Sequence, residues 1–231
     1  MASPRDLFRL AALDMNGTTV EDSGIFESSL RHGLAEVSLP YPEPDVLAPL
    51  RGMAKAEMFR RLIPDPALSD LAYHAFTAAF HTSIRDGAVK PVDGASEVFS
   101  ELRELGLRVC LITGFPPDLQ NAIIRALDWD ELIDLSVSSD EVPQGRPHPD
   151  VILHAAENLG VTDRRRVVVV GDTVNDLLAG ERAGAGLLAG VLTGSHDAAK
   201  LRTVPGAHVI DSVAQLPALL TTVAEGTATV L

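Results

Sequence analysis

The sequence is poor in cysteine and in uninterrupted apolar stretches. Its one cysteine, Cys110, cannot form an intramolecular disulfide, and it lies in an apolar run where a buried strand residue is expected. No stretch approaches the roughly 18 consecutive apolar residues that a membrane-spanning helix needs, and residues 1–9 do not resemble a secretory signal. We therefore expect a cytoplasmic protein that does not associate with membranes.

Positive charge is also scarce. The chain has 19 Lys and Arg against 32 Asp and Glu, which gives a net charge of −13. A field of this sign repels the backbone of nucleic acids and acidic lipid surfaces, so nucleic acid is excluded as a partner. A small anionic substrate would need local cations or a metal ion to bind.

Short apolar runs rich in Val, Leu and Ile indicate buried parallel strands. They lie at residues 8–13, 107–112, 166–170, 186–192 and, more weakly, 207–210. Helical patterns alternate with them at 94–105, 117–127, 149–159, 174–183 and 213–223. This alternation predicts an α/β fold with a doubly wound parallel sheet, whose functional site lies at the carboxyl ends of the strands.

The alternation is interrupted once, between the first strand and the helix that starts at residue 94. Four helical patterns occur there, at residues 28–37, 45–50, 54–62 and 67–85. We expect a helical cap inserted after the first strand, with polar hinges at 21–24 and 86–93. The predicted domains are a core of residues 1–22 and 91–231 and a cap of residues 23–90.

Two predicted strands end in residues suited to phosphate chemistry. The first ends at Asp14, before a sharp turn at Gly17; a carboxylate at a strand tip can act as the nucleophile of phosphoryl transfer. The second ends at Thr113 and Gly114, which offer a hydroxyl and backbone N–H groups to phosphate oxygens. Taken singly, each segment is equally compatible with an ordinary turn.

Two further segments carry charge in favourable positions. Pro147 and Pro149 stiffen the loop that holds Arg146, whose guanidinium can bind a phosphoryl group. Asp172 follows an apolar strand and Asp176 comes four residues later, so both carboxylates can face one Mg²⁺ ion. The alternatives are a surface arginine in a turn and a helix-capping aspartate beside a solvated one.

Together, in this order and at four strand tips, Asp14, Thr113, Arg146 and the Gly171-Asp172-x-x-x-Asp176 segment resemble the motifs of the haloacid dehalogenase superfamily. The resemblance covers essentially the whole chain and implies a Rossmann-like core, with the insertion in the position of that superfamily's first cap class. It implies that Asp14 is the nucleophile and that Thr113 and Arg146 bind the transferring phosphoryl group.

The same resemblance implies that Mg²⁺ is held by Asp14, Asp172 and the backbone carbonyl of residue 16, with Asp176 supporting the metal or its waters. Phosphatases of the family usually carry an aspartate as general acid at the position of Asn16. An amide cannot protonate a leaving group near neutral pH, so the usual proton donor is missing. The turn residues Gly17 and Thr18 are further candidates for substrate contacts.

The segments 14–20, 145–149 and 170–176 are similar to those of phosphonatase-like members, which also lack this acid. In that branch a cap lysine forms an imine with an aldehyde substrate, and Lys55 in a Gly-x-x-Lys pattern matches its place. The alternatives for Lys55 are a residue of substrate specificity, as in related phosphatases with this pattern, and a solvated helix residue. A histidine expected three residues later is replaced by Met58. Gly114 and His148 are the remaining candidates for substrate binding.

These observations predict a Mg²⁺-dependent phosphonatase-like hydrolase that takes a phosphoryl group from a small organophosphorus substrate onto Asp14. The alternatives are a phosphatase for a small phosphate monoester, such as a sugar phosphate, and a non-catalytic binder of phosphoryl compounds. Dehalogenation explains the sequence less well, because that reaction does not need the metal-binding carboxylates of Asp172 and Asp176. The sequence leaves the oligomeric state open, a homodimer included.

Overall fold

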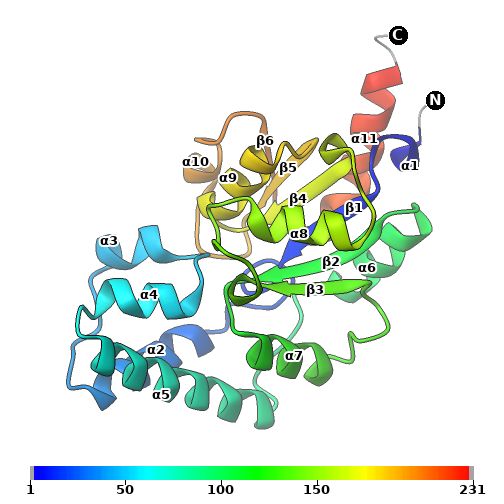
Figure 1. Cartoon of the computed structure of the whole chain (residues 1–231). Coiled ribbons are helices and arrows are strands. Elements are labelled where there is room, and N and C mark those ends of the chain that lie inside the picture. Colours follow the sequence, from blue (N-terminus) through cyan, green and yellow to red (C-terminus); the bar gives the residue numbers. More distant parts are fainter. Residues whose placement is uncertain (1–2, 229–231) are drawn as a thin grey trace.

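The computed structural model describes residues 3–228 and is built on one sheet of parallel strands (Figure 1). The six strands lie in the order β3-β2-β1-β4-β5-β6. Their bounds are β1 Leu10–Asp14, β2 Arg108–Thr113, β3 Leu135–Ser138, β4 Val167–Gly171, β5 Leu187–Val191 and β6 Ala207–Ile210. The chain order reverses at β1, since β2 and β3 lie on one side and β4 to β6 on the other. The predicted doubly wound α/β fold is confirmed.

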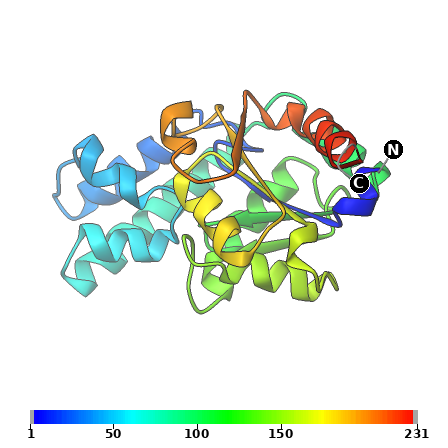
Figure 2. The ribbon, with the colours of Figure 1, turned by 90° about the horizontal axis from the view of Figure 1, so that it is seen from above.

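Helices cover both faces of the sheet. Figure 2 shows α11 and α8 on opposite sides of it. One face packs against α6 Ala95–Glu104, α7 Pro117–Ala126 and α11 Leu216–Ala228, and the other against α8 Asp150–Asn158, α9 Val174–Ala183 and α10 Ala198–Leu201. Side chains of β1 alternate accordingly, with Ala11 and Leu13 in the first core and Leu10 and Ala12 in the second. Burial on both faces explains why the strands read as continuous apolar runs.

The remaining helical elements lie before β1, between β1 and α6, and in later loops of the core, where they are short 3-10 helices labelled η. They are α1 Pro4–Leu7, α2 Ile25–Glu36, α3 Pro44–Leu47, η1 Ala48–Leu50, α4 Lys55–Leu62 and α5 Pro66–Arg85, then η2 Ser139–Glu141, η3 Arg164–Arg166 and η4 Val213–Gln215. We call residues 23–90, which carry α2 to α5, the helical insertion; it lies beyond the carboxyl ends of the strands (Figure 1). Its division from the core as a separate domain stays a prediction.

The helical insertion is held together by a close approach of two helices. A Cβ atom on Gly33 of α2 would lie 2.4 Å from the Ala72 carbonyl oxygen of α5, so only glycine fits there. The rings of Phe26 and Phe76 meet edge to face, with centroids 5.8 Å apart. Helix α2 begins three residues earlier than its apolar pattern indicated, because Gly24 takes a left-handed conformation before it. The insertion therefore has an apolar interior of its own.

The strand β3 was missed by the sequence interpretation, and this changes the setting of Arg146. It has four residues, and Leu135 and Val137 alternate with serines, so it lacks a distinctive apolar run. Strand β3 lies at the edge of the sheet and pairs with β2. Arg146 follows η2 in a loop and does not stand at a strand tip, which corrects the predicted placement.

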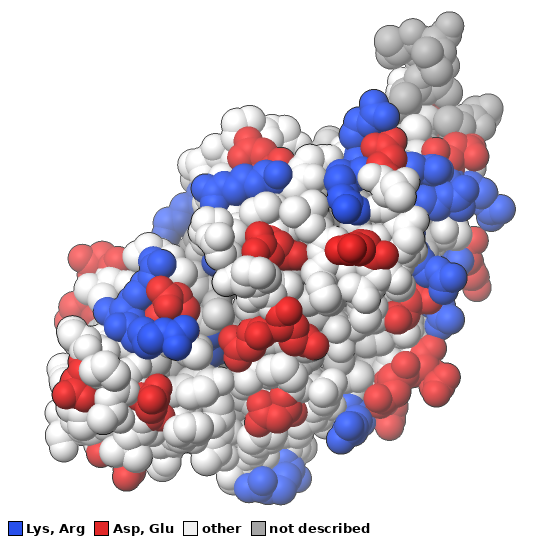
Figure 3. All heavy atoms as spheres, in the orientation of Figure 1, with Lys and Arg blue, Asp and Glu red and all other residues white. Residues whose placement is uncertain are grey.

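Charged groups of both signs are spread over the face seen in Figure 3, with basic side chains gathered over α4. On that helix Arg60 and Arg61 pair with Glu57 at 3.2 and 2.9 Å. Cys110 is fully buried in β2, as expected for a strand residue. Among residues 3–228, no helix combines the length and the apolar character that crossing a bilayer would require.

Candidate active site

The sheet order brings Thr113, Asp14 and Asp172 to one edge. Strand β1 lies between β2 and β4, and the register pairs Leu13 with both Leu111 and Val170, so the three strands end level with one another. Asp14 and Thr113 are the last residues of their strands, and Asp172 directly follows β4. The tips of three neighbouring strands therefore supply the nucleophile candidate, a hydroxyl and a metal-ligand candidate.

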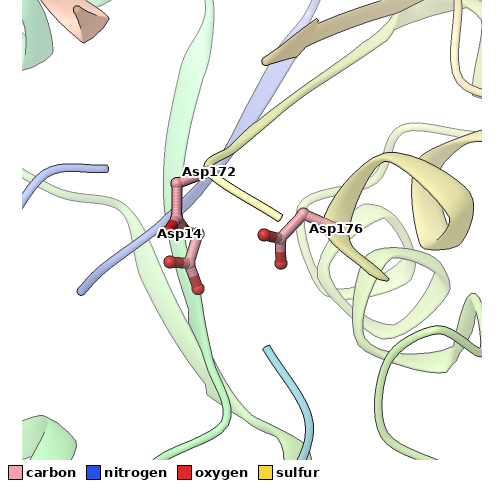
Figure 4. A group of neighbouring side chains, drawn as sticks. All are labelled: Asp14, Asp172 and Asp176. Atoms are coloured by element: carbon pink, nitrogen blue, oxygen red, sulfur yellow. The ribbon is translucent and has the colours of Figure 1, made fainter. Parts of the chain in front are cut away.

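Three buried carboxylates converge at this edge. Each of Asp14, Asp172 and Asp176 offers one oxygen, and these oxygens lie within 4.8 Å of one another. Figure 4 shows the three side chains pointing toward one another, Asp176 from the start of α9. None of the three is more than 5% exposed. Such a set of oxygen ligands can hold a metal ion.

Two glycines, Gly17 and Gly194, leave room for the Asp172 side chain. A Cβ atom at Gly17 would lie 2.6 Å from Oδ2 of Asp172, and one at Gly194 would lie 2.1 Å from it. Gly17 also has a φ of +86°, which side chains rarely adopt. The same oxygen accepts a hydrogen bond from the backbone N–H of Ser195 at 2.6 Å. The turn after β1 is thus shaped to receive a carboxylate from β4.

The two carboxylate oxygens of Asp176 have different partners, Thr173 and Arg146. Its Oδ2 accepts hydrogen bonds from the backbone N–H and the hydroxyl of Thr173, at 2.9 and 2.6 Å, and so closes the N-terminus of α9. Its Oδ1 accepts from Arg146. The capping residue is Thr173, not Asp172, and Asp176 is buried, so the alternative of a capping aspartate beside a solvated one does not hold.

Arg146 lies between two of the carboxylates. One nitrogen, Nη1, donates to Oδ1 of Asp14 at 2.5 Å and to Asp176, and the residue is 1% exposed. Its Nε has no hydrogen-bond partner among the described residues. Burial raises the pKa of Asp14 to about 6 although Arg146 opposes the shift, and burial together with Asp14 raises the pKa of Asp172 to about 8.

The negative charge of the site exceeds its positive charge, and this excess indicates whether a divalent cation fits. Three buried carboxylates are accompanied by one guanidinium in direct contact, and two of their pKa values are raised. Mg²⁺ prefers oxygen ligands and takes one or two carboxylates together with water and phosphate oxygens. Asp14, Asp172 and Asp176 therefore fit Mg²⁺, and ligation by the carbonyl of Asn16 stays a prediction.

Asp14 and Asp172, but not Asp176, line a cavity of about 30 Å³ between the core and the helical insertion. The core contributes Asp14, Asn16, Thr113, Gly114, Phe115, Arg146, Asp172, Thr173 and Ser195, and the insertion contributes Phe26, Arg51, Gly52 and Lys55. This volume holds little more than water. The space between the insertion and the strand tips is therefore narrow.

Thr113 and Gly114 have distinct surroundings at the end of β2. The Thr113 hydroxyl oxygen accepts a hydrogen bond from the Phe115 backbone N–H at 3.1 Å, which leaves its proton free to be donated. The Gly114 carbonyl accepts from the Lys55 backbone N–H at 2.8 Å. A Cβ atom on Gly114 would lie 2.1 Å from the Met53 carbonyl oxygen, so glycine permits the close approach of the insertion.

Lys55 is a basic side chain of the helical insertion that lines the cavity. Its Nζ donates to the Met53 carbonyl at 3.2 Å and lies 5.3 and 5.1 Å from the ring centroids of Phe26 and Phe115. Burial lowers the pKa of Lys55 to about 8, and Arg146 adds to the shift while Asp14 opposes it. A substantial fraction of this amine is therefore neutral, and nucleophilic, at mildly alkaline pH.

Three predicted substrate contacts, Gly17, Thr18 and His148, are not among the residues that line the cavity. Thr18 is fully buried and its hydroxyl has no partner among the described residues. His148 is exposed and lines a separate pocket of about 710 Å³. Conversely, sequence reasoning missed Arg51 and Phe26, which line the cavity. Arg51 directly precedes the Gly-x-x-Lys pattern, and this nearness to Lys55 was the available signal.

We expect Asp172→Asn to remove most of the stabilisation that Mg²⁺ gives, because one of the anionic ligand candidates becomes neutral. In EDTA the same variant should be more stable than the parent by about 0.5–2 kcal/mol, because the raised pKa of Asp172 shows that folding must protonate or bury a carboxylate that is ionised in the unfolded chain, a cost that the amide avoids. Thermal unfolding with EDTA or with Mg²⁺ measures both effects, and the exposed Asp130→Asn is the matched control. An undiminished response to Mg²⁺ in Asp172→Asn would contradict the assignment.

The family model described as haloacid dehalogenase-like hydrolase matches residues 8–184 of the chain. Phosphonoacetaldehyde hydrolase of Bacillus cereus (strain B4264) is 34% identical over 116 residues, which cover 50% of this chain and 44% of that protein. A phosphonoacetaldehyde hydrolase-like protein of Syntrophobacter fumaroxidans is 30% identical over 210 residues, covering 79% and 72%. Phosphoglycolate phosphatase of Thiobacillus denitrificans is 24% identical over 185 residues, covering 76% and 80%.

Solved structures share the fold. A hydrolase from Pseudomonas syringae has a TM-score of 0.82 at 22% identity, covering 94% of this chain and 99% of that one. A phosphonoacetaldehyde hydrolase-like protein from Oleispira antarctica has a TM-score of 0.80 at 21% identity, covering 99% and 96%. The alignment with the Bacillus cereus enzyme spans less than half of that enzyme's length.

Proposed function

The chain belongs to the haloacid dehalogenase-like hydrolases, and from that premise we propose that it is a phosphonatase-like member acting on a small organophosphorus substrate. The observation that carries the proposal is that Lys55 and Asp14 line the same cavity. The substrate, the metal dependence and a cytoplasmic location are all parts of this proposal.

Asp14 acts as the nucleophile in the proposed reaction. Its carboxylate attacks phosphorus, an acyl–phosphate bond forms, and water later hydrolyses this aspartyl-phosphate to release inorganic phosphate. Arg146 holds Oδ1 of Asp14 in place, and the free proton of the Thr113 hydroxyl is donated to a phosphoryl oxygen. Mg²⁺ held by Asp14, Asp172 and Asp176 would supply positive charge to the phosphoryl oxygens as a Lewis acid.

Lys55 provides a route for the electrons of the breaking bond. Its neutral amine adds to the substrate carbonyl and loses water, which gives a protonated imine. When the carbon–phosphorus bond breaks, its electron pair moves into the imine and forms an enamine. Protonation at carbon and hydrolysis of the imine then release the aldehyde product and the free Lys55 amine.

This route is consistent with Asn16. The cavity contains the carboxyl groups of Asp14 and Asp172 but an amide at position 16, so the described residues lining it include no spare carboxylic acid. An ester that leaves as an alkoxide needs a proton donor as the bond breaks. Electrons that flow into a protonated imine do not need one at that moment. The combination of Asn16 with Lys55 therefore favours carbon–phosphorus cleavage.

The pH dependence of imine formation tests this assignment. With phosphonoacetaldehyde and borohydride, we expect covalent inactivation that speeds up as pH rises from 6 to 8 and levels off above the Lys55 pKa of about 8. The reason is that the neutral amine is the nucleophile, and its fraction grows until the pKa is passed. Mass spectrometry of digested protein should locate the adduct on Lys55.

Lys55→Arg should abolish the trapping, because a guanidinium does not form an imine, whereas Lys90→Arg on the exposed surface should not change it. Trapping that persists in Lys55→Arg, or a rate that keeps rising beyond pH 10, would rule out Lys55 as the reacting amine.

A phosphatase is the second candidate function, and the same lysine supports it. At neutral pH most Lys55 side chains are still protonated, so the ammonium could protonate the leaving oxygen of a phosphate monoester in place of the missing acid. Phosphate release from phosphonoacetaldehyde, set beside a panel of sugar and short-chain phosphate esters, separates the two activities. Binding with no turnover of any compound would instead indicate a non-catalytic binder.

A further inference from the structure

Arg51 is a cation in the closed cavity that the proposed reaction does not use. It lines the cavity together with Lys55, and both lie beside the Phe26 ring, the guanidinium carbon of Arg51 at 5.7 Å from its centroid and the Lys55 amine at 5.3 Å. Arg146 is already held between Asp14 and Asp176 on the core side. The helical insertion thus presents a second, separate positive charge to the substrate.

The guanidinium of Arg51 is held in place but is not fully occupied. Its one short hydrogen bond is from Nη1 to the Ser195 hydroxyl, at 2.9 Å. The carboxylates of Asp22 and Glu27 lie 3.7 and 3.5 Å away, beyond the 2.7–2.9 Å that is usual for charge-assisted hydrogen bonds. A guanidinium has five N–H donors, so Arg51 can still bind an anion in a bidentate manner.

The backbone of Arg51 is fixed relative to the predicted phosphoryl site. The Asn175 side chain donates to the Arg51 carbonyl at 2.6 Å, and Asn175 lies next to Asp176 at the start of α9. A Cβ atom on Gly52 would lie 2.5 Å from the Thr173 hydroxyl, so glycine allows this close contact. The segment that ligates the metal in our proposal therefore also positions Arg51.

Arg51 stands at the outer boundary of the cavity. It also lines a neighbouring pocket of about 530 Å³ that contains Asp22 and Glu27. The ion pairs with these acidic groups are long, so they can be exchanged for shorter ones. A substrate anion at this place would lie between the helical insertion and the core.

We propose that Arg51 binds a carboxylate on the leaving portion of the substrate, so that the preferred substrates are small phosphonates or phosphate esters carrying a second, carboxylic anion. This inference rests on the proposed function for the position of the phosphoryl group at Asp14. Together with Lys55, it favours a β-phosphono-α-keto acid, whose carbonyl forms the imine while the neighbouring carboxylate pairs with Arg51. Bond making and breaking are those given above, except that hydrolysis of the imine releases an α-keto acid in place of the aldehyde.

Binding of compounds that cannot be cleaved tests Arg51 without turnover. Calorimetry with Mg²⁺ would compare phosphonoacetate with ethylphosphonate and 3-phosphonopropionate with propylphosphonate, so that each pair differs in one carboxylate. In the parent protein, at least one carboxylate should bind about 10-fold or more tightly than its partner. Arg51→Met should reduce that preference to about 2-fold, and Arg51→Lys should leave it in between, since the bidentate geometry is lost but the charge remains.

Arg61→Met is the matched control, since Arg61 is an exposed arginine of the same insertion that pairs with Glu57. It should keep the full preference for the carboxylate. Equal affinities within both pairs in the parent, or an unchanged preference in Arg51→Met with normal thermal unfolding, would overturn the inference. A carboxylate preference without borohydride trapping at Lys55, by either phosphonoacetaldehyde or a β-phosphono-α-keto acid, would support Arg51 while refuting the imine route, so the two failures are distinguishable.

Discussion

Replacing the carboxylate of Asp14 by an amide is expected to lower kcat by about 10⁴-fold or more, in line with the loss of other enzyme nucleophiles. The amide of Asp14→Asn has nearly the same shape but cannot form the acyl–phosphate bond. Phosphate release under single-turnover and steady-state conditions, with phosphonoacetaldehyde and with phosphate esters, measures the effect.

The fold of Asp14→Asn should remain intact. The variant removes one of three crowded charges, and Arg146 keeps its contact with Asp176, so the free energy of unfolding in EDTA should not fall. Asp70→Asn, an exposed aspartate on α5, is the control and should have normal activity. If Asp14→Asn turned over substrate as fast as the parent, both the proposed function and the proposed metal chemistry would have to be abandoned.

Arg146→Met should cause the largest loss of stability. The guanidinium is the direct counter-ion of Asp14 and Asp176, and its removal leaves buried carboxylates without compensation. Removing one partner of a buried ion pair typically costs about 3–5 kcal/mol, so we expect a decrease of that size in the free energy of unfolding. Urea titrations in EDTA give the value, and added Mg²⁺ should restore part of it because the cation takes over some of the compensation.

Two controls separate charge from packing at this position. Arg146→Lys keeps one positive charge and should lose clearly less stability than Arg146→Met, although it cannot reproduce the guanidinium geometry. Arg125→Met, an exposed arginine of α7, should change the free energy of unfolding by no more than about 0.5 kcal/mol. Equal losses in the lysine and methionine variants would mean that shape, and not charge, holds Arg146 between the carboxylates.

Most of the architecture could be predicted from the sequence because the strands are buried on both faces. Strands with that environment are continuous apolar runs, so five of the six were recognised, and α9 had the predicted bounds. The sequence did not predict β3, where two apolar residues alternate with serines at the edge of the sheet. Local pattern carries little information about an edge strand of four residues.

Candidate residues at strand ends were also predictable, whereas those on loops were not. Asp14, Thr113 and Asp172 end or follow buried strands, and parallel strands bring their ends to one edge by construction. His148 and Thr18 lie two and four residues beyond Arg146 and Asp14, and Gly114 directly follows Thr113, yet of the three only Gly114 lines the cavity. For a loop residue the direction of the side chain depends on tertiary contacts, which periodicity does not encode.

The sequence by itself determined that this chain forms a doubly wound sheet with carboxylates at its strand tips. The reason is that local apolar patterns indicate strand burial and strand direction. Only the tertiary structure decided that Arg146 lies between Asp14 and Asp176, and that Lys55 and Arg51 reach the same closed cavity. These placements depend on how a distant loop and the helical insertion pack against the core, through contacts such as Met53 with Gly114 and Gly52 with Thr173.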